Sequence, residues 1–306
     1  MTFKPDTGRS VSRRRLLFGT AAGAALAGLS VAAPARAATA APTSGPAPID
    51  IVIHPNSFTP PSQLRGGSVT IRVTTPEPGG RSLLLIKLRA GVSLDRYLTA
   101  LAATSSWDPA ERAAAERELE ACAENFGGAV VTSDSAVSFT QFLLPGTYHF
   151  VNFDYTSGTA VPQVKPVTVT GLGTPRIPDV EDYVLHRERN DTVSFLLPTR
   201  KLAATGEHLV INTTRHLNEA VLSRLAPGAT AEDVAAYFEA IKNGQWPSES
   251  PVTTQPVGLA PISGGKQAIV RTELPAGDYL LYSYATNPET GHARAVEGLY
   301  RLVKLV

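Results

Sequence analysis

The chain has 306 residues, of which 43% are hydrophobic and 18% charged, so it is long enough for two packed domains and is unlike a disordered chain. Its formal net charge is +1, and without residues 1–37 it is −4, which excludes the basic surface that nucleic-acid binding requires. Cys122 is the single cysteine. An intrachain disulfide, a zinc-thiolate cluster and a CxxC redox pair are therefore excluded.

Residues 1–37 have the pattern of a twin-arginine export signal. Arg13, Arg14 and Arg15 precede a long Ala, Gly and Leu stretch, and residues 35–37 supply a small-x-small cleavage pattern. The alternative is a membrane anchor at residues 16–33, which is less favoured because Gly and Ala transfer weakly into lipid. The sequence therefore predicts a signal peptide at 1–37, a secreted or extracytoplasmic location, membrane contact only during export, and a flexible spacer at 38–48.

The next part of the chain alternates in the manner of β-strands, with two helices inserted. Strands are predicted at 49–53, 69–73, 83–88, 136–142, 147–154 and 164–170. Ser93 can cap a helix that runs to about residue 103. Asp108 and Pro109 can open a second helix over 110–124, which Gly127 and Gly128 would end. Cys122 lies within this helical pattern, and we interpret it as a small buried hydrophobe.

A proline-containing stretch at 172–190 is predicted as a linker, and the pattern of strands then returns. Strands are predicted at 192–197, 207–213, 218–225, 267–273, 278–285 and 298–306. A helix is predicted from Thr230 to Gly244, and residues 247–261 are predicted as a long loop next to Trp246. Each part of the chain thus contains several strands and a helical insertion.

The two parts match each other in register, which indicates an internal repeat. The offsets between the matched positions drift by only a few residues over a whole domain, as expected when short loops absorb the length changes. The matched pairs are Phe58 with Phe195, Gly67 with Gly206, Leu88 with Leu225, Gly91 with Gly228, and Tyr148 with Tyr279.

The segments 218–228 and 274–279, with their Leu-Ala-Pro-Gly and Leu-Pro-Ala-Gly-Asp-Tyr turns, resemble bacterial cupredoxin-like domains. The resemblance covers most of 191–306 and, more faintly, 49–171. It implies a mostly β fold of two tandem antiparallel Greek-key β-sandwiches, each with a helical insertion. The predicted domains are accordingly 49–171 and 191–306.

In the plastocyanin-type pattern of this family, copper is held by two His, one Cys and one Met. In the second domain these positions fall on Asn218, Ser283, Arg294 and Leu299. In the first domain the first His and the Cys positions fall on Arg81 and Asn152. Because a blue-copper centre depends on the thiolate, we expect no cofactor, with copper kept as an alternative.

Two histidines keep a metal site open as an alternative. His216 and His292 each lie two residues from an expected ligand position and could converge as a surface copper or zinc site. Polar residues are also expected near the former metal end, where they either form a ligand pocket or simply replace the metal by hydrogen bonds. These residues are Asn218, Glu219, Ser283, His292 and Arg294.

Enzyme motifs give little support for catalysis. The mature sequence contains no HExxH and no GxSxG, and Gly264-Gly265-Lys266 lacks the Ser or Thr of a phosphate loop. The leading hypothesis is an exported, non-catalytic protein that binds or scaffolds an unknown extracytoplasmic ligand or protein. The alternatives are a copper-binding or electron-transfer protein that uses His216 and His292, and a secreted enzyme with a pocket between its domains.

Overall fold

A computed structural model of the chain describes residues 47–153, 162–173 and 177–306. The predicted signal peptide and nearly all of the predicted spacer lie outside the described residues. Within those three ranges, no helix is both long and apolar enough to cross a membrane.

The first half, residues 47–173, contains seven strands and two helices. The strands are β1 (Ile49–Val52), β2 (Gln63–Thr74), β3 (Arg81–Leu88), β4 (Ala123–Val131), β5 (Val137–Leu143), β6 (Gly146–Phe153) and β7 (Gln163–Leu172). The helices are α1 (Leu94–Ala103) and α2 (Pro109–Cys122). Both helices begin as the sequence predicts, because Ser93 accepts a hydrogen bond from the amide of Arg96 and Asp108 accepts one from the amide of Ala110.

The second half, residues 177–306, contains nine strands, one helix and a 3₁₀ turn. The strands are β8 (Asp182–Arg189), β9 (Thr192–Leu196), β10 (Lys201–Leu202), β11 (Thr205–Asn212), β12 (Asn218–Arg224), β13 (Val257–Ile262), β14 (Gln267–Glu273), β15 (Gly277–Tyr282) and β16 (Tyr300–Leu305). Helix α3 (Ala231–Lys242) starts with a capping box between Thr230 and Asp233, and η2 spans Arg294–Glu297.

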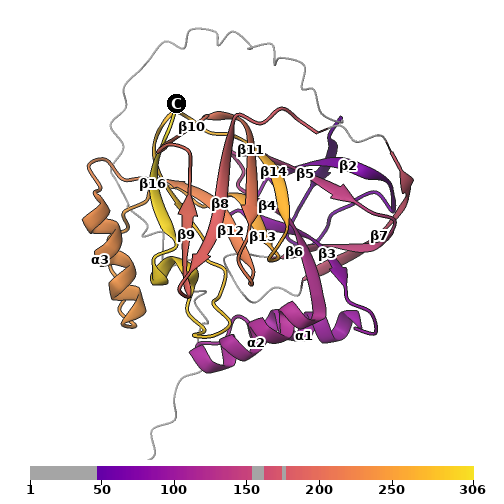
Figure 1. Cartoon of the computed structure of the whole chain (residues 1–306), viewed down its shortest axis with the longest axis horizontal. Coiled ribbons are helices and arrows are strands. Elements are labelled where there is room, and N and C mark those ends of the chain that lie inside the picture. The colour runs from indigo at the N-terminus through magenta and orange to yellow at the C-terminus, as the bar shows by residue number, and fades with distance from the viewer. Residues whose placement is uncertain (1–46, 154–161, 174–176) are drawn as a thin grey trace, which may run out of the picture.

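The strands form two stacked sheets, and helices cover one of them (Figure 1). The outer sheet has the order β1-β2-β5-β14-β11-β8-β9, and the middle sheet has the order β10-β16-β15-β12-β13-β4-β3-β6-β7. One core cluster fills the space between the sheets, for example Val210 against the middle-sheet residue Leu259. A second cluster packs the other face of the middle sheet against the helices, as Ile86 and Tyr97 do. The molecule is therefore mostly β, with a sandwich architecture.

Both sheets continue from one half into the other. Strand β4 pairs antiparallel with β13 in the middle sheet, and β5 pairs antiparallel with β14 in the outer sheet. Corresponding details recur in the halves: Tyr148 donates its hydroxyl to the carbonyl oxygen of Leu144 at 3.0 Å, and Tyr279 donates to Pro275 at 2.9 Å. The two halves are thus joined edge to edge through equivalent strands.

The joining strands β4 and β13 were not predicted from the sequence. The sequence predicts a helix to residue 124 that Gly127 and Gly128 end, and a loop over 247–261. Instead, Gly128 and Gly258 allow the close contact between strands. Gly128 has φ +149° and Gly258 has φ +150°. A Cβ atom would lie 1.9 Å from the oxygen of Leu83 at Gly128, and 2.4 Å from that of Ala220 at Gly258.

Part of the predicted linker is also a strand. Residues 182–189 form β8, which pairs in parallel with β11, just as β1 pairs in parallel with β2. This segment therefore contributes to the outer sheet of the second half. The charged residues that suggested a linker, such as Arg187 and Arg189, lie on the exposed side of this strand.

Candidate functional site

In the first half, the positions that match copper ligands hold a buried hydrogen-bonded pair. Arg81 lies on β3 and Asn152 on the neighbouring strand β6, with exposed fractions of 4% and 0%. Arg81 Nε donates to Asn152 Oδ1 at 3.0 Å, and Asn152 Nδ2 donates to the carbonyl oxygen of His54 at 3.0 Å. The two side chains form hydrogen bonds with each other and with the backbone.

In the second half, the equivalent strands also carry a buried polar group. Asn218, Glu219 and Ser283 each have an exposed fraction of 0%. Asn218 Nδ2 donates to Thr214 Oγ1 at 2.8 Å, and the amide of Glu219 donates to Ser283 Oγ at 3.1 Å. Glu219 Oε1 accepts the amide of Tyr284 at 2.6 Å. These residues hold neighbouring segments together from inside the fold.

The two later ligand positions are buried as well. Leu299 is 1% exposed and packs in the core. Arg294 is 5% exposed, and its Nη1 lies 3.9 Å from Glu297 Oε2. Burial lowers the pKa of Arg294, because it disfavours the charged guanidinium. Of the five residues expected to line a ligand pocket, only His292 is partly exposed. The other four are buried and do not line an open pocket.

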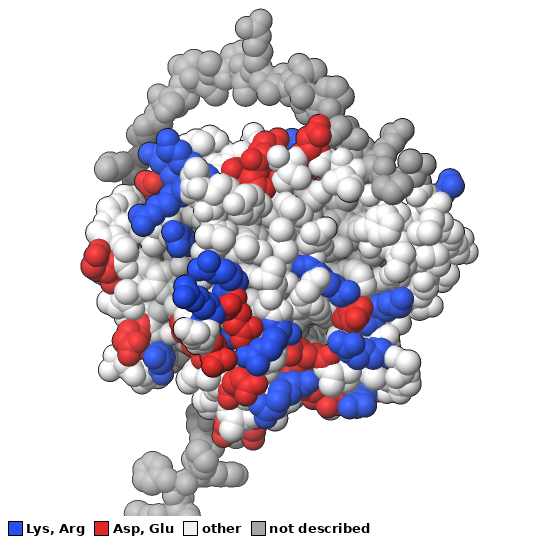
Figure 2. Space-filling view, viewed as in Figure 1, with Lys and Arg blue, Asp and Glu red and all other residues white. Residues whose placement is uncertain are grey.

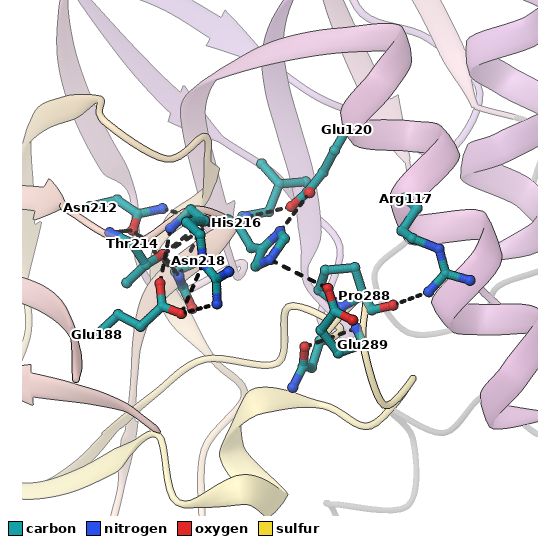
Figure 3. Close-up of polar contacts among 12 residues, drawn as sticks. Arg117, Glu120, Glu188, Asn212, Thr214, His216, Asn218, Pro288 and Glu289 are labelled. Carbon is teal, nitrogen blue, oxygen red and sulfur yellow. Dashed lines mark hydrogen bonds and ion pairs between the residues drawn. The ribbon is translucent and has the colours of Figure 1, made fainter. Parts of the chain in front are cut away.

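His216 lies between carboxylates from the two halves (Figure 3). Its Nδ1 is 2.8 Å from Glu120 Oε2 of helix α2, and its Nε2 is 4.0 Å from Glu289 Oε1. Glu120 Oε1 also accepts the amide of Leu217 at 2.7 Å. His292 lies in the loop after β15, where its amide donates to Thr290 Oγ1 at 3.2 Å. In the described part of the chain, no group of three or more His, Cys, Asp or Glu is arranged to hold a metal ion.

Helix α2 of the first half covers the loop of the second half that would carry the late copper ligands. Arg112 Nε donates to the carbonyl oxygen of Gly291 at 2.6 Å, and Arg117 donates to that of Pro288. The absence of a side chain at Gly291 permits this approach, since a Cβ atom added there would lie 1.8 Å from the carbonyl oxygen of Pro109. Sequence reasoning missed the contact because Arg112 and Gly291 are 179 positions apart.

A surface pocket of about 370 Å³ opens at the junction between the halves. Its lining comes from both: Arg89, Glu120, Ala121, Arg215, Leu217, Ser263 and Gly264. The arginines already have acidic partners, with Arg215 Nη2 at 2.6 Å from Glu188 and Arg89 Nη1 at 3.8 Å from Glu124. Among these residues only Gly264 belongs to a motif considered in the sequence, Gly264-Gly265-Lys266, because the lining is gathered from segments far apart in the chain.

The side chains at the positions expected for copper ligands do not fit copper. An arginine guanidinium carries a positive charge and offers no lone pair, while a leucine side chain has no donor atom. The amides of Asn152 and Asn218 and the hydroxyl of Ser283 are hard oxygen and nitrogen groups, unlike the thiolate and thioether that a blue-copper centre uses. The one thiol, Cys122, is buried in α2, where burial raises its pKa.

The comparisons with solved structures found copper proteins. Auracyanin A, a "blue" copper protein from Chloroflexus aurantiacus, is 18% identical, with coverage of 41% of this chain and 100% of auracyanin and a TM-score of 0.28. A copper-containing nitrite reductase from Thermus scotoductus is 12% identical, with coverage of 86% and 55% and a TM-score of 0.23. A multicopper oxidase is 11% identical, with coverage of 85% and 88% and a TM-score of 0.22. No protein-family model and no curated protein matches the sequence.

Proposed function

We propose that this chain is an exported, non-catalytic binding or scaffold protein made of two degenerate cupredoxin-like units. The observation that carries the proposal is the chemistry of the buried pair Arg81 and Asn152, together with Asn218 and Ser283 in the second half. At these positions the side chains satisfy one another or the backbone. They stabilise the fold and leave no soft donor for copper.

The joined architecture supports a role as a rigid platform. The halves share both sheets, and α2 is held against the loop at Gly291. Such an arrangement resists hinge motion between the halves and presents continuous surfaces to a partner. The twin-arginine pattern at residues 13–15 supports export, and the partner proposed is an extracytoplasmic ligand or protein.

Metal analysis of the exported protein tests the proposal. The protein would be purified from its own host and its copper content measured by mass spectrometry. After addition of copper(II), absorption and paramagnetic resonance spectra would be recorded. We expect less than stoichiometric copper and no thiolate-to-copper charge-transfer band. One tightly held copper per chain that survives dialysis would overturn the proposal. The Cys122→Ser variant controls for metal bound by the single thiol.

A copper or electron-transfer role through His216 and His292 is the second candidate. It is supported by His216, whose imidazole lies among the carboxylates of Glu120 and Glu289. Imidazole and carboxylate together suit copper(II) or zinc. Calorimetric titration of both metals should then detect binding that His216→Gln and His292→Gln each abolish. If binding is absent, or is unchanged in the two variants, this candidate fails.

The junction pocket favours a third candidate, a secreted enzyme whose substrate binds between the halves. Its lining mixes arginine, carboxylate and hydroxyl groups within about 370 Å³, which suits a small polar ligand. Screening small polar metabolites by thermal shift, with Arg89→Ala as the matched pocket variant, would test it. A ligand that stabilises the wild type but not the variant, and that is then chemically converted, would support this candidate over the binding role.

A further inference from the structure

The outer sheet has one face that no element of the described fold covers. Its inner face packs against the middle sheet, and the helices pack against the far side of the middle sheet. An antiparallel sheet with a solvated face normally alternates apolar residues inside with polar residues outside. Figure 2 shows few charged side chains over the centre of this face, where β8, β9, β11 and β14 lie.

In the second half the expected alternation fails. On β11, His208 and Val210 point inward and are buried, so Leu209 and Ile211 point to solvent. Leu209 pairs with Tyr183 on β8 and with Ile269 on β14. Ile211 pairs with Leu185, which in turn pairs with Leu196 on β9. Apolar side chains are therefore adjacent across four strands of the solvent face.

These residues form an apolar belt that runs across the strands, and Phe142, two residues after Thr140 on β5, is a separate exposed apolar residue beyond it. Phe142 is 49% exposed, Tyr183 42% and Leu196 38%, whereas Leu185, Leu209 and Ile211 are partly exposed. The belt is defined as Tyr183, Leu185, Leu196, Leu209 and Ile211, and Ile269, which pairs with Leu209, is buried with an exposed fraction of 7%. An exposed, contiguous apolar surface of this kind marks an interaction site.

The fold itself does not require the belt, because the repeat provides a comparison. The pair Gly67 and Gly206 aligns Thr70 with Leu209 and Arg72 with Ile211. Thr70 and Arg72 lie on the same solvent face of β2, where Arg72 Nη1 is 3.4 Å from Asp50. The first half thus has an ordinary polar surface at the positions where the second half is apolar.

Opposite charges flank the belt at the two ends of the strands. At the end where β8 begins, Arg271 lies 3.9 Å from Glu207 and 3.4 Å from Glu273, and Glu181 accepts the amide of Glu207. At the other end, Arg187 and Arg189 follow Leu185 on the same face of β8. In Figure 2, acidic side chains lie above the uncharged area, and basic side chains mixed with acidic ones lie at its lower border.

We propose that the belt is a self-association surface, on which two copies of this chain stack outer sheet on outer sheet. The two-fold axis runs along the belt, across the strands. This axis turns each copy upside down relative to the other, so that the acidic end of one copy meets Arg187 and Arg189 of its partner, twice in each dimer. The uncharged belts pack in the centre, in the way that sheets pack in a sandwich.

The charge pattern selects a second copy over an unrelated partner. Both signs are present on one face, at opposite ends, so the face is complementary to itself after the two-fold rotation. Because the centre is free of charge, self-stacking buries no unpaired ion. We expect an interface of moderate area, with a dissociation constant in the micromolar range.

The test is the mass of the exported chain in solution, measured by light scattering and sedimentation up to about 100 μM, well above a micromolar Kd. The belt variant is Leu209→Thr with Ile211→Arg, which copies the residues at the equivalent positions of the first half. We expect the wild type to dimerise and this variant to be monomeric, because its dimer dissociation constant should be at least tenfold higher. Leu172→Thr is the matched control, since Leu172 is 57% exposed on β7 in the middle sheet.

Two further variants make the result independent of folding defects. Leu196→Lys changes only an exposed side chain at the sheet edge and should also give monomers, with an unchanged circular dichroism spectrum. Arg187→Glu should weaken the dimer at low salt and lose that effect at high salt. A wild type that stays monomeric throughout the concentration range, or a dimer that survives the belt variant, would overturn the proposal.

Discussion

Glu120 and His216 lie 96 positions apart and meet across the two halves, with His216 Nδ1 at 2.8 Å from Glu120 Oε2. The second carboxylate oxygen of Glu120 accepts the amide of Leu217. One side chain of α2 therefore holds the loop that leads into β12. Helix α2 thus belongs to the first half by sequence but stabilises the second half by contact.

Glu120→Ala should lower the free energy of unfolding by about 2 kcal/mol, because it leaves two partly buried donors without their acceptor. Urea unfolding followed by tryptophan fluorescence measures this. Trp107 and Trp246 are the only tryptophans, and their rings lie 6.4 Å apart. Glu118→Ala is the control, since Glu118 pairs with Arg96 at the surface and should matter far less. Equal losses in the two variants would contradict the assigned role of Glu120.

The glycines of the joining strands should be intolerant of a side chain. Gly128→Ala or Gly258→Ala should each destabilise the protein by about 3 kcal/mol or more, because the new Cβ would overlap a carbonyl oxygen of the adjacent strand. Gly91→Ala and Gly228→Ala are matched controls. Both have positive φ but open space around the Cβ position, so about 1 kcal/mol is expected. Thermal unfolding compares all four, and similar shifts would show that crowding is not decisive.

Acid should weaken the fold through buried histidines. Complete burial lowers the pKa of His186 to about 4, and burial also lowers the pKa of His208 and His149. Between pH 6.5 and 4 the unfolded chain binds a proton at His186 that the folded chain does not. The free energy of unfolding therefore decreases as the pH is lowered from 6.5 to 4, by about 3 kcal/mol for this group. Unfolding in urea at a series of pH values should show a flatter profile for His186→Gln. The exposed control His54→Gln should keep the wild-type slope.

The buried pair Arg81 and Asn152 should behave as a coupled unit. Asn152→Leu removes an acceptor from a buried guanidinium and should cost about 3 kcal/mol of stability. The double variant Arg81→Met with Asn152→Leu should recover part of this loss, because the buried guanidinium that lost the Asn152 acceptor is removed too. Denaturant unfolding of the two single variants and the double variant gives the coupling energy. Strict additivity would show that the pair is not a unit.

Cys122 should be inert in the folded protein. It is fully buried, and burial together with the nearby Glu118 carboxylate raises its pKa, so little thiolate is present. An aromatic disulfide reagent should react slowly with the native protein and rapidly after addition of urea. Ser105→Cys, at an exposed position after α1, is the accessible control. Rapid labelling of native wild type would refute the burial of this thiol.

Local signals in the sequence were sufficient for the starts of the helices and for most of the strands. Ser93, Asp108 and Thr230 cap their helices because a short polar side chain next to an apolar periodic segment has few other partners for its oxygen. Alternation identified β1 and β2, since each has one face in the core. The internal repeat stays a prediction, made from turn glycines and paired tyrosines that stand at nearly constant offsets.

What only the tertiary structure decided was how the repeated units meet. Strands β4 and β13 were missed because Gly127 and Gly128 suggested the end of a helix and residues 247–261 a loop, whereas Gly128 and Gly258 are required by close contact with distant backbone. The burial of the residues at the expected ligand positions, the contact of α2 with the loop at Gly291 and the apolar belt around Leu209 likewise depend on strand register. Register arises from contacts between residues far apart in the chain, and no local pattern of residues encodes which distant partner a strand will find.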